Sequence, residues 1–159
     1  GLDFAALRFF NAYGPGQDGT SPYSTAISAW CTRLHKGEPL RSDGDGEQTR
    51  DYVYVKDVVA ANMLASTADM GEGTGLDSRA FNVGTGVGTS VLQLADALER
   101  VAETSRPRDH RMARAGELQH STLDPGLIQS RGWSPTYTLE EGLRETYDHI
   151  VKQRARATE

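Results

Sequence analysis

The sequence lacks several features that would assign it to a specialised class of protein. Cys31 is the only cysteine in 159 residues, so no disulfide can form within the chain, which favours a reducing cytoplasm. No apolar run approaches the roughly 18 residues of a membrane span. The formal net charge of −5 provides no basic field for nucleic acid or an anionic membrane. We therefore expect a cytoplasmic protein with neither a nucleic acid nor a membrane as partner.

Residues that could act as metal ligands or nucleophiles are also scarce. Cys31 lies in an apolar helical stretch and is expected to pack as a small hydrophobe. No Gly-Lys-Ser/Thr follows a glycine run, which excludes the phosphate loop of kinases and ATPases. The histidines lack metal-ligand spacing, and no second cysteine or acidic cluster accompanies them: His35, His110, His120 and His149. We expect no metal site.

Strand-like and helix-like segments alternate along the chain, which predicts an α/β fold. The apolar run 4–10 is typical of a strand buried on both faces of a parallel sheet, and residues 11–16 are expected to end it. Further strands are predicted at 38–42, 51–55, 79–83 and 110–113. Since only two or three of these runs are long enough to form a sheet, the predicted sheet is incomplete.

Apolar residues at helical spacing predict the remaining elements. Helices are expected over 24–35, 56–70, 90–101, 125–129 and 138–154. Thr89 or Ser90 can cap the third of these, and Gly37 is a stop signal after the first. Residues 71–78 are expected to form a glycine-rich loop.

The stretch 44–55 (GDGEQTRDYVYV) joins an acidic glycine turn to a strand. Arg50 stands at the junction, where a planar guanidinium suits bidentate binding of phosphate or carboxylate. The alternative is an ion pair with Asp51, Asp57 or an acid from a loop. The residues of this stretch leave both interpretations open.

A second glycine-rich stretch, 82–90 (NVGTGVGTS), follows a predicted strand and opens a helix. This context is typical of a dinucleotide pyrophosphate site. The spacing is G-x-G-x-G rather than G-x-G-x-x-G, and Glu103 ends the same helix instead of following a second strand. A strand-to-helix turn with a helix cap, and with Asn82 facing a cleft, is the alternative.

Five segments in this order resemble the extended short-chain dehydrogenase/reductase (SDR) family, and within it the NAD-dependent nucleotide-sugar epimerase/dehydratase group that includes UDP-glucose 4-epimerases. They are 8–17 (RFFNAYGPGQ), 37–57 (GEPLRSDGDGEQTRDYVYVKD), 81–86 (FNVGTG), 114–117 (RAGE) and 132–135 (GWSP). The resemblance covers essentially the whole chain.

The resemblance implies that residues 1–159 form the carboxyl-terminal part of a Rossmann-type extended SDR fold: its last parallel strands and the smaller, nucleotide-sugar-binding lobe. The amino-terminal NAD-binding portion, with its glycine-rich loop, is absent from this sequence. The resemblance places the family's catalytic Tyr-x-x-x-Lys in that absent portion as well. Lys56 does stand four residues after Tyr52, but both belong to the segment 37–57, which the resemblance assigns to the nucleotide-sugar-binding part. The sequence begins as if within a domain.

The resemblance also implies roles for individual residues. Asn11 would bond the sugar nucleotide near its diphosphate, Arg50 and Arg114 would bind the diphosphate, and Glu117 would accept hydrogen bonds from the ribose hydroxyls. Phe10 would pack near the nicotinamide of NAD. The segment Arg41, Ser42 and Asp43 would line the nucleobase. Relatives usually carry an aromatic or apolar residue at position 43, so Asp43 leaves the identity of the base open.

The function implied is binding of a nucleotide-diphosphate sugar, with a UDP-sugar favoured, in an enzyme that removes and returns hydride at sugar C4. A nucleotide-sugar 4,6-dehydratase is the alternative activity. A chain that binds nucleotide sugar without catalysis of its own is the alternative from another class. The implied partners are the missing amino-terminal half and, for an intact enzyme, a second copy in a homodimer.

Overall fold

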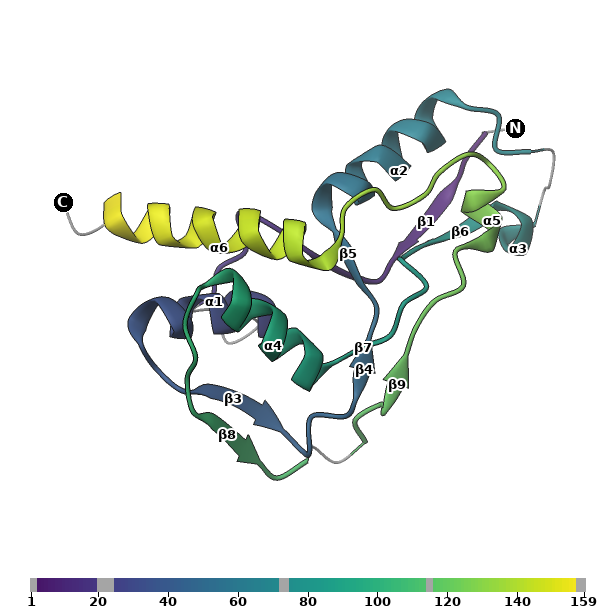
Figure 1. The fold of residues 1–159 in the computed structure, drawn as a ribbon. Helices are drawn as coiled ribbons and strands as arrows, with labels where there is room; N and C mark the ends of the chain where they lie inside the picture. Colours follow the sequence, from purple (N-terminus) through teal and green to yellow (C-terminus); the bar gives the residue numbers. More distant parts are fainter. Residues whose placement is uncertain (1–2, 20–24, 72–74, 114–115, 157–159) are drawn as a thin grey trace.

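The computed structural model describes residues 3–19, 25–71, 75–113 and 116–156 (Figure 1). At one end, strand β1 (Ala6–Phe9) pairs in parallel with β6 (Ala80–Val83). Helices α2 (Val55–Thr67), α3 (Leu76–Arg79) and α5 (Gly126–Gln129) surround this pair. The mixed α/β class and the parallel pairing agree with the fold predicted from the sequence.

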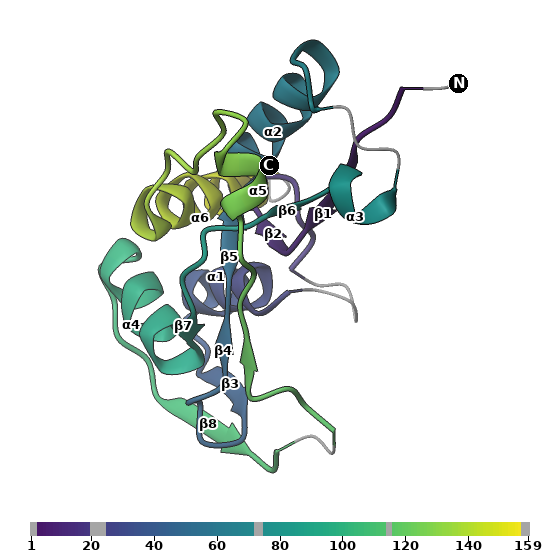
Figure 2. The ribbon, with the colours of Figure 1, turned by 90° about the vertical axis from the view of Figure 1, so that its right-hand side faces the viewer.

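At the other end of the molecule, β3 (Leu40–Asp43) pairs in parallel with β8 (Arg108–Arg111). Helices α1 (Ala26–Lys36) and α4 (Val91–Val101) lie beside them, and α6 (Leu139–Arg156) packs on both helices. Figure 2 shows these layers from the side.

Short strands connect the two ends. Strand β2 (Asn11–Tyr13) runs parallel to β5 (Tyr52–Tyr54). Strand β4 (Thr49–Arg50) lies between β7 (Thr89–Ser90), to which it is antiparallel, and β9 (His120–Ser121), to which it is parallel. The line from β4 into β5 therefore forms the spine of the molecule (Figure 2).

Local capping sets the ends of the main helices. The Thr25 hydroxyl accepts the Ser28 N–H at the start of α1, and Gly37 ends the helix with φ +73°, in the left-handed region that favours glycine. At the start of α4, Ser90 and Gln93 form a reciprocal capping box. These interactions involve near neighbours in the sequence, which is why the sequence predicts both helices to within two residues.

Two hydrophobic cores meet at β5. Val53 belongs to the core around β1, β6 and α2, which also contains Phe81, Ile128 and Trp133. The next residue, Tyr54, belongs to the core between α1, α4 and α6. Successive side chains of a strand point to opposite faces, so a single strand serves both cores.

Two buried aspartates fasten loops to this spine. The Asp51 carboxylate accepts the N–H groups of Thr85 (2.8 Å) and Gly86 (3.0 Å) and the Thr85 hydroxyl (2.6 Å). The Asp57 carboxylate accepts the Thr136 N–H (2.9 Å) and the Tyr137 N–H (3.3 Å). A buried carboxylate is stable only when its oxygens are satisfied in this way.

The structure corrects the prediction for the first strand. β1 spans only Ala6–Phe9, and Phe9 is 46% exposed, so the strand is not buried on both faces. Within the described ranges β1 pairs with β6 alone, which leaves its other edge open. Residues Asn11–Tyr13, expected to end the strand, instead form β2 because β5 supplies a partner 41 positions away in register.

The second long helix is shorter than predicted, and some of its apolar side chains are exposed. α2 ends at Thr67 rather than at residue 70, and its apolar side chains Val59 and Met63 are more than half exposed. A four-residue helix, α3, overlaps the segment 71–78, which was predicted as a loop. Among the described residues, no helix is long and apolar enough to cross a membrane.

A candidate nucleotide pocket beside β4

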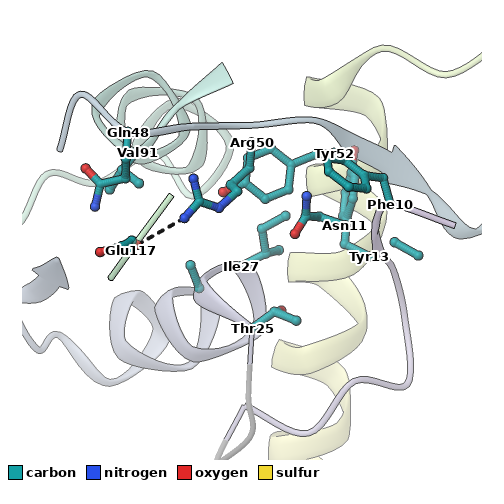
Figure 3. Close-up of a pocket in the computed structure, with 12 residues that line it drawn as sticks. Phe10, Asn11, Tyr13, Thr25, Ile27, Gln48, Arg50, Tyr52, Val91 and Glu117 are labelled. Atoms are coloured by element: carbon teal, nitrogen blue, oxygen red, sulfur yellow. Dashed lines mark hydrogen bonds and ion pairs between the residues drawn. The ribbon is translucent and has the colours of Figure 1, made fainter. Parts of the chain in front are cut away.

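A cavity of about 490 Å³ lies along one side of β4 and β5 (Figure 3). Its volume is in the range of small-molecule sites. The lining combines apolar side chains, aromatic rings and a few polar groups from β2, α1, β4, β5, α4 and the segment before β9. The lining residues are Phe10, Asn11, Ala12, Tyr13, Thr25, Ala26, Ile27, Gln48, Arg50, Tyr52, Val91 and Glu117.

Strand alternation places three side chains in a row along this cavity. Gln48, Arg50 and Tyr52 are two residues apart and all face the cavity, whereas the intervening Asp51 is fully buried on the opposite side. In Figure 3, Arg50 lies between Gln48 with Glu117 on one side and Tyr52 with Asn11 on the other. The cavity thus has a polar end, with a carboxylate and an amide, and an aromatic end, with Arg50 between them.

Both terminal nitrogens of the Arg50 guanidinium bond to other groups of the protein. Its Nη1 donates to the carbonyl oxygens of Thr49 (2.8 Å) and Leu118 (2.7 Å). Its Nη2 donates to Glu117 Oε1 at 3.1 Å, and both side chains are about one fifth to one quarter exposed (21% and 24%). Of the two interpretations of Arg50, an ion pair with a loop acid is therefore present, and the pair faces the cavity.

The aromatic end is built around Asn11 and two tyrosines. Asn11 donates its amide N–H to the Asp51 carbonyl (3.0 Å), and Phe10 lies beside it in the lining. The rings of Tyr13 and Tyr52 meet edge to face, with centroids 6.4 Å apart. Burial raises the pKa of Tyr52 to about 12, although the nearby Arg50 lowers it, so this phenol is neutral at physiological pH.

None of the three residues expected to line a nucleobase is among the residues that line the cavity, and the segment is joined to the lining through Gln48. The Arg41 side chain is exposed and faces Asp109 at 3.8 Å, and the Ser42 hydroxyl lies 3.1 Å from Nδ1 of His110. The Asp43 carbonyl accepts the Gln48 amide at 2.7 Å. Trp30 anchors the same segment by donating to the Arg41 carbonyl at 2.8 Å.

One further predicted site residue lies elsewhere. Asn82 donates its amide to the Asp124 carbonyl at 3.0 Å and is not among the residues that line the cavity. Arg114 lies outside the described residues. The structure thus gathers Phe10, Asn11, Arg50 and Glu117 around one cavity, and their roles toward a ligand stay predictions.

Several lining residues were not anticipated from the sequence. Gln48 and Tyr52 could have been found by counting two residues in each direction from Arg50 along the strand. Ile27 and Val91 carry only the apolar periodicity of the helices predicted at 24–35 and 90–101, which indicates packing in a core. Their cavity-facing positions depend on how α1 and α4 pack, which no local pattern encodes.

The 82–90 stretch forms a strand-to-helix turn and a cap, not an open anion cradle. The N–H groups of Thr85 and Gly86 are already bonded to the Asp51 carboxylate. A Cβ on Gly84 would lie 2.7 Å from Asp51 Oδ2, so the carboxylate fills the space beside the turn. The described residues therefore do not fit a complete NAD pyrophosphate site, and only Phe10 was assigned to NAD.

In the part of the chain that the structure covers, no group of three or more His, Cys, Asp or Glu side chains could hold a metal ion.

Comparisons with known proteins agree with this architecture. Residues 1–84 match the sequence model of the NAD dependent epimerase/dehydratase family. A UDP-glucose 4-epimerase of Mycolicibacterium smegmatis is 34% identical over 150 residues, which cover 92% of this chain and 45% of that protein.

Solved structures give the same result. The UDP-glucose 4-epimerase of Thermotoga maritima, in complex with UDP-glucose, superposes with a TM-score of 0.86 at 36% identity, over 96% of this chain and 47% of that one. The Thermus thermophilus UDP-glucose 4-epimerase, in complex with NAD, has a TM-score of 0.79 at 33% identity, over 94% and 47%. The chain thus spans about half the length of these relatives, and it belongs to the NAD-dependent epimerase/dehydratase family of extended SDR proteins.

Proposed function

We propose that this chain is the nucleotide-sugar-binding part of an NAD-dependent sugar 4-epimerase, with a UDP-sugar as the favoured ligand. The observation that carries the proposal is the order of groups along the cavity: Glu117 and Gln48, then Arg50, then Asn11 and Tyr52. The most similar solved structure described above contains UDP-glucose, which has nucleoside, diphosphate and sugar in a matching order.

Each group suits the part of the ligand it would meet. A carboxylate such as Glu117 accepts hydrogen bonds from a ribose diol, and a guanidinium such as Arg50 binds diphosphate oxygens with two parallel N–H donors. Asn11 and Tyr52 offer an amide and a phenol to the far end of the diphosphate and to the sugar. The segment 41–43, which is joined to the lining through Gln48, would lie on the side of the base.

Catalysis requires groups beyond these 159 residues. When bound, NAD accepts and returns hydride at the sugar carbon, and the family's Tyr-Lys pair serves as base. Tyr52 and Lys56 have the spacing of that pair but do not replace it: Tyr52 lies in β5 and lines the cavity, whereas Lys56 lies in α2, is not among the lining residues and donates to Glu145 Oε1 (3.0 Å). Tyr54 has no lysine four residues on; its hydroxyl donates to Glu145 Oε2 (2.6 Å), and burial raises its pKa. The hydrogen bond to Glu145 also raises the pKa of Lys56, which keeps this amine protonated. We therefore propose that the chain alone binds nucleotide sugar without turning it over.

The open edge of β1 is the proposed contact for an amino-terminal α/β half. Phe4, just before β1, and Phe9 on β1 are 40% and 46% exposed, and Val59 and Met63 on α2 are 55% and 59% exposed. A parallel strand added to β1 would pair its free backbone groups and cover these side chains. The same binding role serves the epimerase and the dehydratase activities of the family, and an intact enzyme of this kind would assemble as a homodimer.

Titration calorimetry of the purified chain with UDP and UDP-glucose tests the binding role. We expect saturable heat with both ligands, and a weaker response to uridine, which lacks the diphosphate. No heat beyond dilution from a chain with intact circular dichroism would overturn the proposal. A parallel assay with NAD and UDP-glucose should give no product, and turnover by this chain alone would refute the assignment of catalysis to residues outside it.

A further inference from the structure

We infer that Glu117 makes the cavity selective for nucleoside diphosphates over simple phosphate anions, because it is the resident anion on Arg50. In the ligand-free chain its carboxylate occupies one amino group of the guanidinium. A nucleoside diphosphate would displace it from Arg50 and engage it again through the ribose diol. This inference rests on the nucleotide-binding function proposed above and adds to it how the site discriminates.

The geometry of Arg50 limits what can be exchanged. Its Nη1 is committed to two backbone carbonyls, of Thr49 and Leu118, at 2.8 and 2.7 Å. Backbone carbonyls at these distances fix the plane of the guanidinium. The Nη2 group is held by a side chain, Glu117, which can rotate away without moving the backbone. Ligand exchange at Arg50 therefore takes place on the Nη2 side.

The charges in the cavity determine what it costs a phosphate group to replace Glu117 on Arg50. Among the described residues that line the cavity, Arg50 and Glu117 are the only ones with a formal charge. While they are paired, the described part of the lining carries no net formal charge. A phosphate group must break the pair, and it leaves the Glu117 carboxylate beside a new negative charge in a partly buried site, where screening by water is reduced.

A nucleoside offsets that cost and a bare anion cannot. The two ribose hydroxyls are donors, and each can bond the displaced carboxylate, which accepts through both oxygens. Inorganic pyrophosphate has the same bridging group as a nucleoside diphosphate but no vicinal diol, and the one P–OH that it keeps near neutral pH belongs to the anionic group itself. Glu117 thus favours one ligand class and opposes the other through the same negative charge.

The substitution Glu117→Gln separates these two effects. Glutamine keeps the shape of the side chain but removes its charge, so pyrophosphate should bind about threefold to fivefold more tightly, which is the size of a partly exposed ion pair. Uridine should bind about tenfold more weakly, because its diol loses a charged acceptor. Titration calorimetry with pyrophosphate, uridine and UDP measures both changes in the same protein.

The matched control is Glu47→Gln, which removes the same net charge. Glu47 is exposed, lies in the turn before Arg50 and does not line the cavity. It should change the affinity for each ligand by less than about twofold, because exposed charges are well screened. Thermal unfolding of both variants checks that the fold is retained.

Opposite changes for pyrophosphate and uridine in Glu117→Gln support the inference. Weaker binding of both ligands by the folded variant overturns it, since Glu117 would then serve only to position Arg50. Equal tightening of pyrophosphate in the Glu47 variant also overturns it, because net charge would explain the effect. If the unmodified chain binds neither UDP nor pyrophosphate, the nucleotide-binding function itself fails.

Discussion

Arg50 and Asp51 are adjacent in sequence, and their side chains act on opposite sides of the same strand. The Arg50 guanidinium faces the cavity and pairs with Glu117, while the Asp51 carboxylate is fully buried against the turn at Thr85 and Gly86. The Arg-Asp pair therefore joins a cavity-facing cation to the anchor of a loop that lies behind it.

Replacing Asp51 by Asn should lower the free energy of unfolding, because Asp51 anchors the turn at Thr85 and Gly86. The amide keeps one acceptor but turns a donor toward the N–H groups of Thr85 or Gly86, leaving a buried donor unsatisfied. We expect a loss of about 2–3 kcal/mol in the free energy of unfolding, measured by urea titration. Asp109→Asn, at an aspartate whose side chain is 62% exposed, should cost less than about 0.5 kcal/mol. Equal losses at the two positions would contradict the anchoring role.

Replacing Arg50 by Lys should weaken UDP binding although the charge is kept. A lysine ammonium cannot donate simultaneously to the Thr49 and Leu118 carbonyls and to a phosphate in the planar geometry of arginine. We expect an affinity for UDP about tenfold lower by calorimetry, the size of one lost charge-assisted hydrogen bond. Arg41→Lys is the control, since Arg41 is exposed and outside the lining. A large effect at Arg41 would restore its predicted side-chain contact with the base.

The Cys31 thiol should be unreactive in the folded chain. Burial raises its pKa to about 12 from its ordinary value of 9.0, so the thiolate is scarce at mildly alkaline pH. A thiol reagent that absorbs on reaction should label the chain only after guanidinium chloride unfolds it. Because the folded-state pKa is the higher one, the contribution of this proton to stability is complete below pH 9.0 and is lost as the pH rises toward about 12. Rapid labelling of folded protein would show that α1 opens readily.

Gly142→Ala should destabilise the chain even though alanine is the better helix former. Glycine in a helix interior costs about 1 kcal/mol relative to alanine. In α6, however, a Cβ at position 142 would collide with the Tyr13 hydroxyl and lie 2.8 Å from the Tyr54 ring. We expect a net loss of about 1–3 kcal/mol, as for overpacked cores. A rise in the melting temperature would mean that the tyrosine rings move aside at little cost.

Sequence patterns predicted what local interactions determine. The α4 helix was expected over 90–101 and spans Val91–Val101, because Ser90 and Gln93 cap it within one turn. The short strands β2 and β7 were not anticipated, since their existence depends on partners distant in sequence. The segment 4–10 was apolar enough for a strand covered on both faces, but the residues that would cover Phe9 are not in this chain's described structure.

The site shows the same division. The resemblance assigned Asn11, Arg50 and Glu117 to one ligand, and the structure brings all three to one cavity. The ion pair between Arg50 and Glu117 joins residues 67 positions apart, so no spacing in the sequence could have indicated it. Strand alternation from Arg50 would have been enough to place Gln48 and Tyr52 in the cavity. The residue types did not, however, show where the turn ends and β4 begins.

The position of Val53 and Tyr54 in separate cores has a consequence for ligand binding. The strand that lines the cavity is also the wall common to both halves of the molecule. Loosening either core would shift Gln48, Arg50 and Tyr52 and reduce the fraction of chains with an intact cavity. If the proposed function holds, the affinity for nucleotide will fall when either core is loosened, and a bound nucleotide will stabilise both cores together by mass action.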